Sequence, residues 1–179
     1  MTRVAVVGAG SWGTALSALL SRKGHDVCLW AFEPDVARQI TEGRENVSYL
    51  AGIQLPENLQ STADLAKALQ GAEVLVSVSP AQVVGGVMAE AAPHIEDDTL
   101  IVSASKGIET TTLRRMDEVM SEVLDPAQVD GFTVLSGPSF ALEVAEEVPT
   151  AVVAASRRED AALAVQDLFQ TDCFRVYTG

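Results

Sequence analysis

A short apolar run that ends in a glycine turn constrains the fold of this chain more than any other feature. Residues 4–7 (Val-Ala-Val-Val) lead directly into Gly8-x-Gly10-x-x-Gly13, and an apolar-periodic segment follows. The pattern predicts a buried strand, a tight turn and a helix. In that geometry Gly8 makes the turn, Gly10 lets the backbone approach a pyrophosphate, and Gly13 lets the helix pack closely on the strand. The free N–H groups of the helix N-terminus would face the phosphates, so the stretch predicts a dinucleotide-binding turn.

Composition and charge limit the class of protein. The 179 residues are 47% hydrophobic and 21% charged, which is typical of one globular domain with a sizeable core. A net charge of −13 argues against nucleic acid or an anionic membrane surface as a partner. The glycine turn begins so early that no signal peptide is expected, and no apolar stretch approaches the roughly 18 residues of a membrane helix. We therefore expect a cytoplasmic protein without membrane insertion.

The cysteines and histidines do not suggest a metal site or a disulfide. Cys28 and Cys173 each lie inside an apolar run, which predicts reduced, buried thiols. His25 and His94 lie at predicted turns, with no cysteine or carboxylate at ligand spacing. No metal ligand is therefore predicted.

Apolar strands and amphipathic helices alternate along the chain. The predicted strands are 4–7, 27–32, 73–79, 99–104, 132–136, 150–155 and 174–177. The predicted helices are 12–23, 34–42, 64–70, 83–91, 113–124 and 156–169, the last opened by a capping box, Ser156-x-x-Glu159. Residues 44–58 have no clear period, and a connection that long usually has a function or packs over something. The alternation predicts one doubly wound, Rossmann-type α/β domain over residues 1–179, its mainly parallel sheet covered by helices on both faces.

Candidate site residues follow the predicted strands, because ligands of such sheets bind beyond the carboxyl ends of the strands. Glu33 lies 20 residues after Gly13, where an acidic side chain can accept hydrogen bonds from the adenosine ribose hydroxyls. Equally, Glu33 could cap the helix that Pro34 opens. Phe32 could lie against the adenine or ribose, or in the core, and the core position is favoured on sequence alone.

The cofactor preference depends on the charges near the end of the second strand. Residues 31–33 include no arginine or lysine, so a 2′-phosphate would lack a cationic partner there. This favours NAD over NADP, although Arg38 and Arg44 are candidates that could reverse the preference.

Two further strand ends offer groups for a substrate. Lys106 is the only lysine after residue 67, and it follows a strand at a Gly107 turn. Such a lysine is usually solvated, but beside a pocket it could offer an ammonium to an anionic or carbonyl substrate. Gly137 and Ser139 lie in a turn in which Ser139 is the expected N-cap of residues 140–145, and a ligand contact there is compatible with that role.

Five blocks of the sequence together resemble the NAD(P)-dependent glycerol-3-phosphate dehydrogenases. They are residues 8–16, Glu45-Asn46 with Tyr49-Leu50, Ser105-Lys-Gly-Ile-Glu109, Ser136-Gly-Pro-Ser-Phe-Ala141 and Phe174-Arg-Val-Tyr-Thr178. The resemblance extends over essentially the whole chain, and the third and fourth blocks are more specific than the glycine motif. It implies a two-domain enzyme that interconverts dihydroxyacetone phosphate and sn-glycerol 3-phosphate and supplies glycerol phosphate for phospholipid synthesis.

The resemblance also implies roles for individual residues. The implied cofactor contacts are Ser11, Trp12, Lys106, Ala141 and Pro80, the last beside the nicotinamide. The implied substrate contacts are Lys106, Gly137 and Ser139. Many bacterial members have arginine at position 32, whereas this chain has Phe32 followed by Glu33. The departure resembles the NAD-using members and agrees with the charge argument.

The family's second, helical domain has no counterpart within these 179 residues. That domain holds the catalytic lysine and the Arg-Asn pair for the substrate phosphate, so both are expected beyond Gly179, and Lys106 matches a different motif. We therefore expect a cofactor-binding half that has no catalytic residue of its own, is inactive alone, and could self-associate as a homodimer. A stand-alone NAD-binding or sensing module is the alternative, and another dehydrogenase of the same superfamily is a third.

Overall fold

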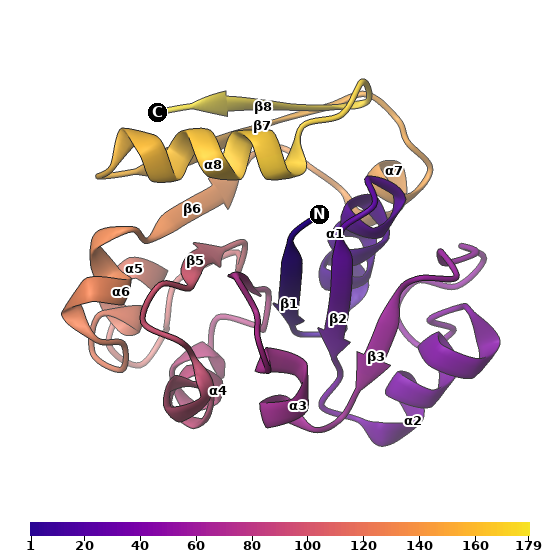
Figure 1. Cartoon of the computed structure of the whole chain (residues 1–179), viewed down its shortest axis with the longest axis horizontal. Coiled ribbons are helices and arrows are strands. Elements are labelled where there is room, and N and C mark those ends of the chain that lie inside the picture. Colours follow the sequence, from indigo (N-terminus) through magenta and orange to yellow (C-terminus); the bar gives the residue numbers. More distant parts are fainter.

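An eight-stranded sheet passes through the middle of the molecule (Figure 1). The computed structural model describes all of residues 1–179. The strand order is β3-β2-β1-β4-β5-β6-β7-β8. The strands are β1 (Arg3–Val7), β2 (Asp26–Trp30), β3 (Gln60–Thr62), β4 (Val74–Ser77), β5 (Leu100–Ser103), β6 (Thr133–Ser136), β7 (Thr150–Ser156) and β8 (Phe174–Thr178).

The helices connect the strands. They are α1 (Ser11–Arg22), α2 (Pro34–Arg38), α3 (Leu65–Leu69), α4 (Val84–Ala91), α5 (Met116–Met120), α6 (Pro126–Asp130), α7 (Ala141–Ala145) and α8 (Glu159–Phe169). A π-helical turn, η1 (Gln39–Gly43), extends α2, and a 3-10 turn, η2 (Ala92–His94), extends α4. None of these helices is long and apolar enough to span a membrane.

The sheet changes direction of winding at β1. The strand β1 pairs in parallel with β2 on one side and with β4 on the other. The six strands from β3 to β6 in the order of the sheet, which include β2 and β1, are all parallel. The strand β7 is antiparallel to β6, and β8 is parallel to β7. The predicted doubly wound, mainly parallel sheet is confirmed. Its switch point, where ligands of such folds bind, lies between β1 and β4.

Helices cover both faces of the parallel part of the sheet. In β1, Val4 and Val6 join a core with α1, α2, α7 and α8. Ala5 and Val7 point to the other face and join a second core with α3, α4 and α5. The strand is buried on both faces because every residue after Arg3 in it is apolar.

Strands β7 and β8 depart from the prediction of a sheet covered on both faces. Their side chains alternate between buried and exposed positions. The helix α8 lies along one face of both strands (Figure 1), and no helix covers the other. We call this the outer face; its exposed side chains are Ala151, Val153, Ala155, Arg175 and Tyr177.

Two elements were missed by the sequence analysis. The strand β3 consists of Gln-Ser-Thr at the sheet edge, so no apolar alternation marks it. The helix α6 is a single short turn opened by Pro126, and Gln128 Oε1 accepts a hydrogen bond from Asp125 N at 3.1 Å. Both elements are shorter than the windows in which periodicity can be recognised.

The predicted helix over 113–124 is shorter than expected. Leu113 has a φ of 59° and an exposed side chain, so it cannot belong to a right-handed helix. The helix α5 begins at Met116, and Arg115 is its N-cap residue. Glu118 Oε2 accepts a hydrogen bond from Arg115 N at 2.9 Å. The apolar spacing correctly indicates a helix, but the left-handed backbone at Leu113 means that the helix begins three residues later than predicted.

The predicted capping box at the start of α8 is wrong. The helix begins at Glu159 after Arg158, and Ser156 is the last residue of β7. The Ser156 hydroxyl donates to the carbonyl oxygen of Phe132 at 2.9 Å and accepts from Arg158 N at 3.3 Å. It therefore joins β7 to the start of β6 instead of capping a helix.

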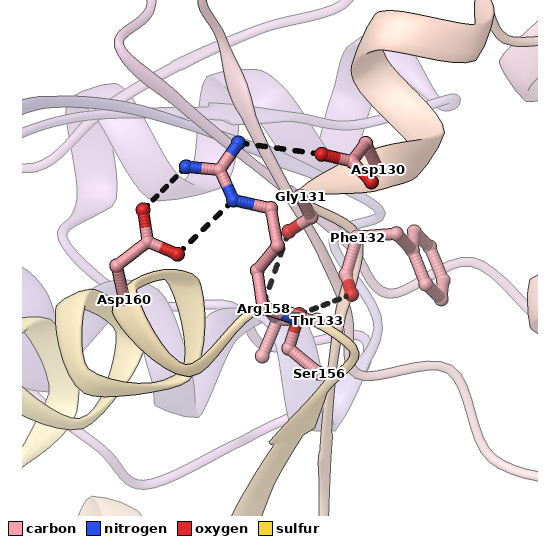
Figure 2. A network of polar contacts seen from close by, with 7 residues as sticks. All are labelled: Asp130, Gly131, Phe132, Thr133, Ser156, Arg158 and Asp160. Carbon is pink, nitrogen blue, oxygen red and sulfur yellow. Dashed lines mark hydrogen bonds and ion pairs between the residues drawn. The ribbon is translucent and has the colours of Figure 1, made fainter.

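Arg158 completes this polar network, which Figure 2 shows from close by. Its guanidinium binds the carboxylate of Asp160 and lies 3.6 Å from Asp130 Oδ2. The guanidinium also holds the pKa of Asp160 below its usual range. These side chains are about half exposed or more, so the ion pairs of Arg158 with Asp130 and Asp160 have little effect on stability.

The two cysteines differ in burial. Cys28 is buried, and burial raises the pKa of its thiol. Cys173 is half-buried, so the prediction of a buried thiol is wrong for this residue. No group of three or more histidine, cysteine, aspartate or glutamate side chains is placed to hold a metal ion.

Candidate functional site

Two glycines of the β1–α1 turn are required by the packing of the protein itself. Gly8 has a φ of 126°, and a Cβ there would lie 2.9 Å from Ser79 N. A Cβ on Gly13 would lie 1.9 Å from the carbonyl oxygen of Gly8. The structure thus gives Gly8 the turn and Gly13 the close contact between helix and strand.

Gly10 differs from the other two glycines because nothing lies within 4 Å of the place where its Cβ would be. Its φ of −69° is accessible to any residue. The fold therefore does not need a glycine here, and the missing side chain leaves open space beside the end of α1.

The N-terminus of α1 borders this space and has no internal partner for its charge. Gly10 is the N-cap residue, no side chain caps the helix, and the first turn contains no acidic residue. The N–H groups of the first turn and the helix dipole favour an anion at such an end. The open space and the uncapped helix are together suited to an anion such as a phosphate group, and we call this space the phosphate cradle.

Three predicted site residues from separate blocks meet beside this cradle. Lys106 Nζ donates to the carbonyl oxygen of Ser139 at 2.8 Å and to its Oγ at 3.1 Å. The same ammonium lies 5.0 Å from the centroid of the Trp12 ring. At this distance the ring face attracts the cation. One cation is thus fixed between the ends of β5 and β6 and the start of α1.

The expected capping role of Ser139 is wrong. Phe140 is the N-cap residue of α7, and it makes no side-chain cap bond. Ser139 is 6% exposed, and its hydroxyl contacts Lys106 Nζ and the carbonyl oxygen of Gly137 instead. Trp12 adds a buried indole Nε1 that has no hydrogen-bond partner. The cluster therefore keeps unused hydrogen-bonding capacity.

The remaining strand-end residues lie at the same edge of the sheet. A Cβ on Gly137 would come 2.8 Å from the carbonyl oxygen of Ala151, so the packing of β6 on β7 requires this glycine. Ala141 is half-buried at the start of α7 and packs against the core. Pro80 is exposed after β4. Their predicted ligand contacts stay predictions.

The prediction that Phe32 belongs to the core is wrong. Its side chain is 77% exposed and makes an edge contact with Trp30, at 6.2 Å between ring centroids. Glu33 occupies the N-cap position of α2, but its carboxylate caps nothing. Instead, Glu33 Oε1 accepts a hydrogen bond from the hydroxyl of Tyr49 at 2.6 Å.

The two arginines that could reverse the cofactor preference are both engaged within the protein. Arg38 Nη2 pairs with Asp35 Oδ1 at 2.6 Å. Arg44 Nη1 donates to the carbonyl oxygen of Leu59 at 2.8 Å. Glu33 is the first charged side chain after β2, and it is exposed.

Sequence reasoning missed the role of Asn46. This residue is completely buried, and its Nδ2 donates to the carbonyl oxygen of Ala9 at 2.9 Å and to Thr14 Oγ1 at 2.8 Å. Its Oδ1 accepts from Tyr49 N at 3.1 Å. Asn46 thus ties the irregular segment to the glycine turn. Its place in a block shared with the family was the only signal.

Replacing Asn46 with alanine should lower the free energy of unfolding by about 2–3 kcal/mol, because several buried polar groups lose their partner. Denaturant unfolding followed by circular dichroism measures the change. Asn58→Ala is the matched control, because Asn58 is exposed and makes one bond, from Nδ2 to the carbonyl oxygen of Ser21 at 3.0 Å. Equal losses in the two variants would contradict the anchoring role of Asn46.

The fold and the phosphate cradle define the class of Rossmann-type nucleotide-binding domains. A family model described as "NAD-dependent glycerol-3-phosphate dehydrogenase N-terminus" matches residues 3–162. The chain belongs to this family. The family is one of NAD(P)-dependent dehydrogenases, so NAD or NADP is the class of cofactor.

Individual relatives agree with this assignment. The chain is 50% identical over 175 residues to "Glycerol-3-phosphate dehydrogenase [NAD(P)+]" of Citrifermentans bemidjiense, covering 98% of this chain and 52% of the relative. It is 52% identical over 177 residues to the protein of that name from Geobacter sulfurreducens, covering 99% and 53%. The crystal structure of glycerol-3-phosphate dehydrogenase from Coxiella burnetii superimposes with a TM-score of 0.90 at 34% identity, covering 99% and 54%. The chain thus spans about half the length of the proteins that it matches.

Proposed function

We propose that this chain is the cofactor-binding half of a cytoplasmic glycerol-3-phosphate dehydrogenase. The parent enzyme would transfer hydride reversibly between NAD(P)H and dihydroxyacetone phosphate or sn-glycerol 3-phosphate, and would supply glycerol phosphate for phospholipid synthesis. The observation that carries the proposal is the open space at Gly10 beside the uncapped N-terminus of α1. Membership of the family supplies the substrate class.

The residues present fit a nicotinamide dinucleotide. The pyrophosphate would lie on the backbone N–H groups of Ser11, Trp12 and Gly13, where Gly10 leaves room. Glu33 would accept a hydrogen bond from a ribose hydroxyl. The exposed ring of Phe32 would lie against the adenine. Pro80 and Ala141 would border the nicotinamide end. When bound there, the cofactor supplies or takes up the hydride.

The substrate would meet Lys106, Gly137 and Ser139. The ammonium of Lys106 is held by Ser139 and by the face of Trp12, so it presents a fixed positive charge. A fixed charge can orient an anionic or carbonyl substrate. By resemblance, the proton at the carbinol oxygen would be handled by a lysine of the second domain. General acid–base catalysis is worth about 10²–10⁴-fold in rate, so we expect the chain alone to be inactive.

We further propose that NAD is preferred over NADP. The Glu33 carboxylate would lie beside the ribose 2′-hydroxyl of the bound dinucleotide, and there it would repel a 2′-phosphate. Arg38 and Arg44 both have partners within the protein. Neither arginine is therefore an unpaired cation at the end of β2.

Isothermal titration calorimetry of this chain with NADH and NADPH tests both proposals. We expect NADH to bind about tenfold or more tightly than NADPH, the equivalent of about 1.4 kcal/mol. Glu33→Ala should narrow the gap, because the repulsion of a 2′-phosphate is removed. Glu90→Ala removes a carboxylate from α4 in the opposite helix layer and should leave the ratio unchanged. If the chain binds neither NADH nor NADPH, the proposed function is overturned. If it binds NADPH more tightly than NADH, the proposed preference for NAD is overturned.

The outer face of β7 and β8 bears on assembly. Val153 is 42% exposed and Tyr177 is 57% exposed on this face. In the longer parent protein we propose that further structure covers these apolar side chains. In the 179-residue chain the same face could join two copies as a homodimer.

A further inference from the structure

The segment from Arg44 to Leu55 has no sequence period, yet it is closed on itself. Leu55 N donates to the carbonyl oxygen of Arg44 at 2.8 Å, and Arg44 adopts a left-handed conformation with a φ of 55°. Leu50 is buried in the core between these ends. We call residues 44–55 the ordered loop, because both its ends and its middle are fixed.

Side chains tie the ordered loop to the elements around the proposed nucleotide site. Gln39 of the π-helical turn accepts hydrogen bonds from Ser48 N and Ser48 Oγ, each at 3.3 Å. Asn46 is bound to the carbonyl oxygen of Ala9 in the glycine turn at 2.9 Å. The loop is therefore held between η1 and the turn that carries Gly8 and Gly10.

This anchoring determines where Tyr49 lies. Its backbone N–H is held by Asn46 Oδ1 at 3.1 Å, and its hydroxyl donates to Glu33 Oε1 at 2.6 Å. Both side chains are exposed, and Tyr49 is 46% exposed. A chain of contacts thus leads from Ala9 through Asn46 and Tyr49 to the carboxylate of Glu33. Because the anchored loop already orders the backbone at Tyr49, the exposed hydrogen bond to Glu33 costs less conformational entropy than it would on a free loop.

We propose that Tyr49 is a positioning residue that holds Glu33 in the orientation that accepts the adenosine ribose, and so determines the preference for NAD. This inference rests on the proposed function. The Tyr49 hydroxyl occupies Oε1 of Glu33, which leaves Oε2 to accept a ribose hydroxyl. Without Tyr49 the carboxylate of an exposed glutamate would sample several rotamers, and binding would have to select one of them.

The first experiment removes only the Tyr49 hydroxyl. In calorimetry, Tyr49→Phe should weaken NADH binding roughly three- to tenfold, the range for a single hydrogen bond. NADPH affinity should change less, because a 2′-phosphate cannot use Glu33 as an acceptor. Tyr177→Phe is the matched control, since Tyr177 lies on β8 at the other end of the sheet, and it should leave both affinities unchanged.

A double-mutant cycle then tests whether Tyr49 acts through Glu33. In a Glu33→Ala background, Tyr49→Phe should have no further effect on NADH affinity. Additive losses would overturn the proposal, because they would mean that Tyr49 contributes independently of the carboxylate. Equal NADH affinity of Tyr49→Phe and the unsubstituted chain would also overturn it.

A second readout needs no dinucleotide. The hydrogen bond to Glu33 and the charge of its carboxylate raise the pKa of Tyr49. Tyr177→Phe leaves Tyr49 as the sole tyrosine, so absorbance titration should give a raised pKa that falls when Glu33→Ala is added. A pKa unaffected by Glu33→Ala would overturn the Tyr49–Glu33 pair. If the unsubstituted chain binds neither dinucleotide, the proposed function fails whatever the titration gives. If the unsubstituted chain binds NADH and Tyr49→Phe leaves that affinity unchanged, the proposed function stands and the role of Tyr49 fails.

Discussion

Gly13→Ala should destabilise the folded protein strongly. The added Cβ would lie 1.9 Å from the carbonyl oxygen of Gly8 and 3.1 Å from its carbonyl carbon. Neither atom can move away cheaply, because they belong to backbone at the end of a central strand, and Gly8 N is bound to the carbonyl oxygen of Trp30. Ordinary overpacking costs about 1–3 kcal/mol. With a backbone contact this short we expect a loss of about 4 kcal/mol or more, a large share of the stability of a domain.

The matched control for this prediction is Gly43→Ala. Gly43 ends the π-helical turn, nothing lies within 4 Å of its added Cβ, and its φ is not positive. Denaturant unfolding compares the two variants with the unsubstituted chain. We expect Gly43→Ala to change the midpoint little and Gly13→Ala to unfold at much lower denaturant. A Gly13→Ala protein of normal stability would contradict the packing role assigned to this glycine.

Gly10→Ala should have the opposite profile, with normal stability and NADH affinity reduced on the order of 100-fold. An alanine fits the backbone at this position and meets no atom of the protein within 4 Å. The methyl group would occupy the space in which we propose that the pyrophosphate approaches the backbone. A clash that costs about 3 kcal/mol corresponds to roughly a 100-fold loss in affinity.

Calorimetry with NADH and thermal unfolding of the same sample test this prediction together. Gly43→Ala again serves as the control, because it adds the same methyl group to exposed backbone outside the cradle. Unchanged affinity in Gly10→Ala would mean that the open space is not where the pyrophosphate binds. Loss of stability in Gly10→Ala would mean that the fold, and not the ligand, requires this glycine.

The sequence predicts the centre of the fold well because short-range signals are strong there. Strand β1 is an uninterrupted apolar run, and α1 was predicted to within one residue at each end. Gly24 has a φ of 90°, and His25 N donates to the carbonyl oxygen of Leu20, a helix end for which glycine is suited. Here the local pattern and the tertiary structure agree.

The errors fall where tertiary contacts outweigh local pattern. Three polar residues form β3 because they lie against β2, and nothing in their own sequence indicates a strand. In β7 and β8 the apolar composition predicted burial on both faces, whereas one face has no helix over it. Periodicity describes one element at a time and cannot indicate whether a neighbour covers it.

The site shows the same division. Lys106, Ser139 and Trp12 each follow or precede a predicted strand or helix end, so parallel topology was sufficient to bring them to one edge. The contact between Tyr49 and Glu33 could not be derived, because it depends on how the ordered loop folds. The exposure of Phe32 was missed for a related reason, since an apolar residue at a strand end predicts burial unless the surrounding surface is known.

The reversal between β6 and β7 has a practical consequence for handling the protein. The strand β8 ends beside Ala154 and Ser156, and Ser156 pairs with the first residue of β6. Gly137 follows the opposite end of β6, so the end of β8 lies away from it. Met1 precedes the start of β1, at the end of that strand opposite to Gly8 (Figure 1). Affinity tags, fluorophores or surface linkers attached at either terminus would therefore project away from the glycine turn. The chain can be immobilised by either terminus for ligand measurements, with the edge that carries the glycine turn left facing the solution.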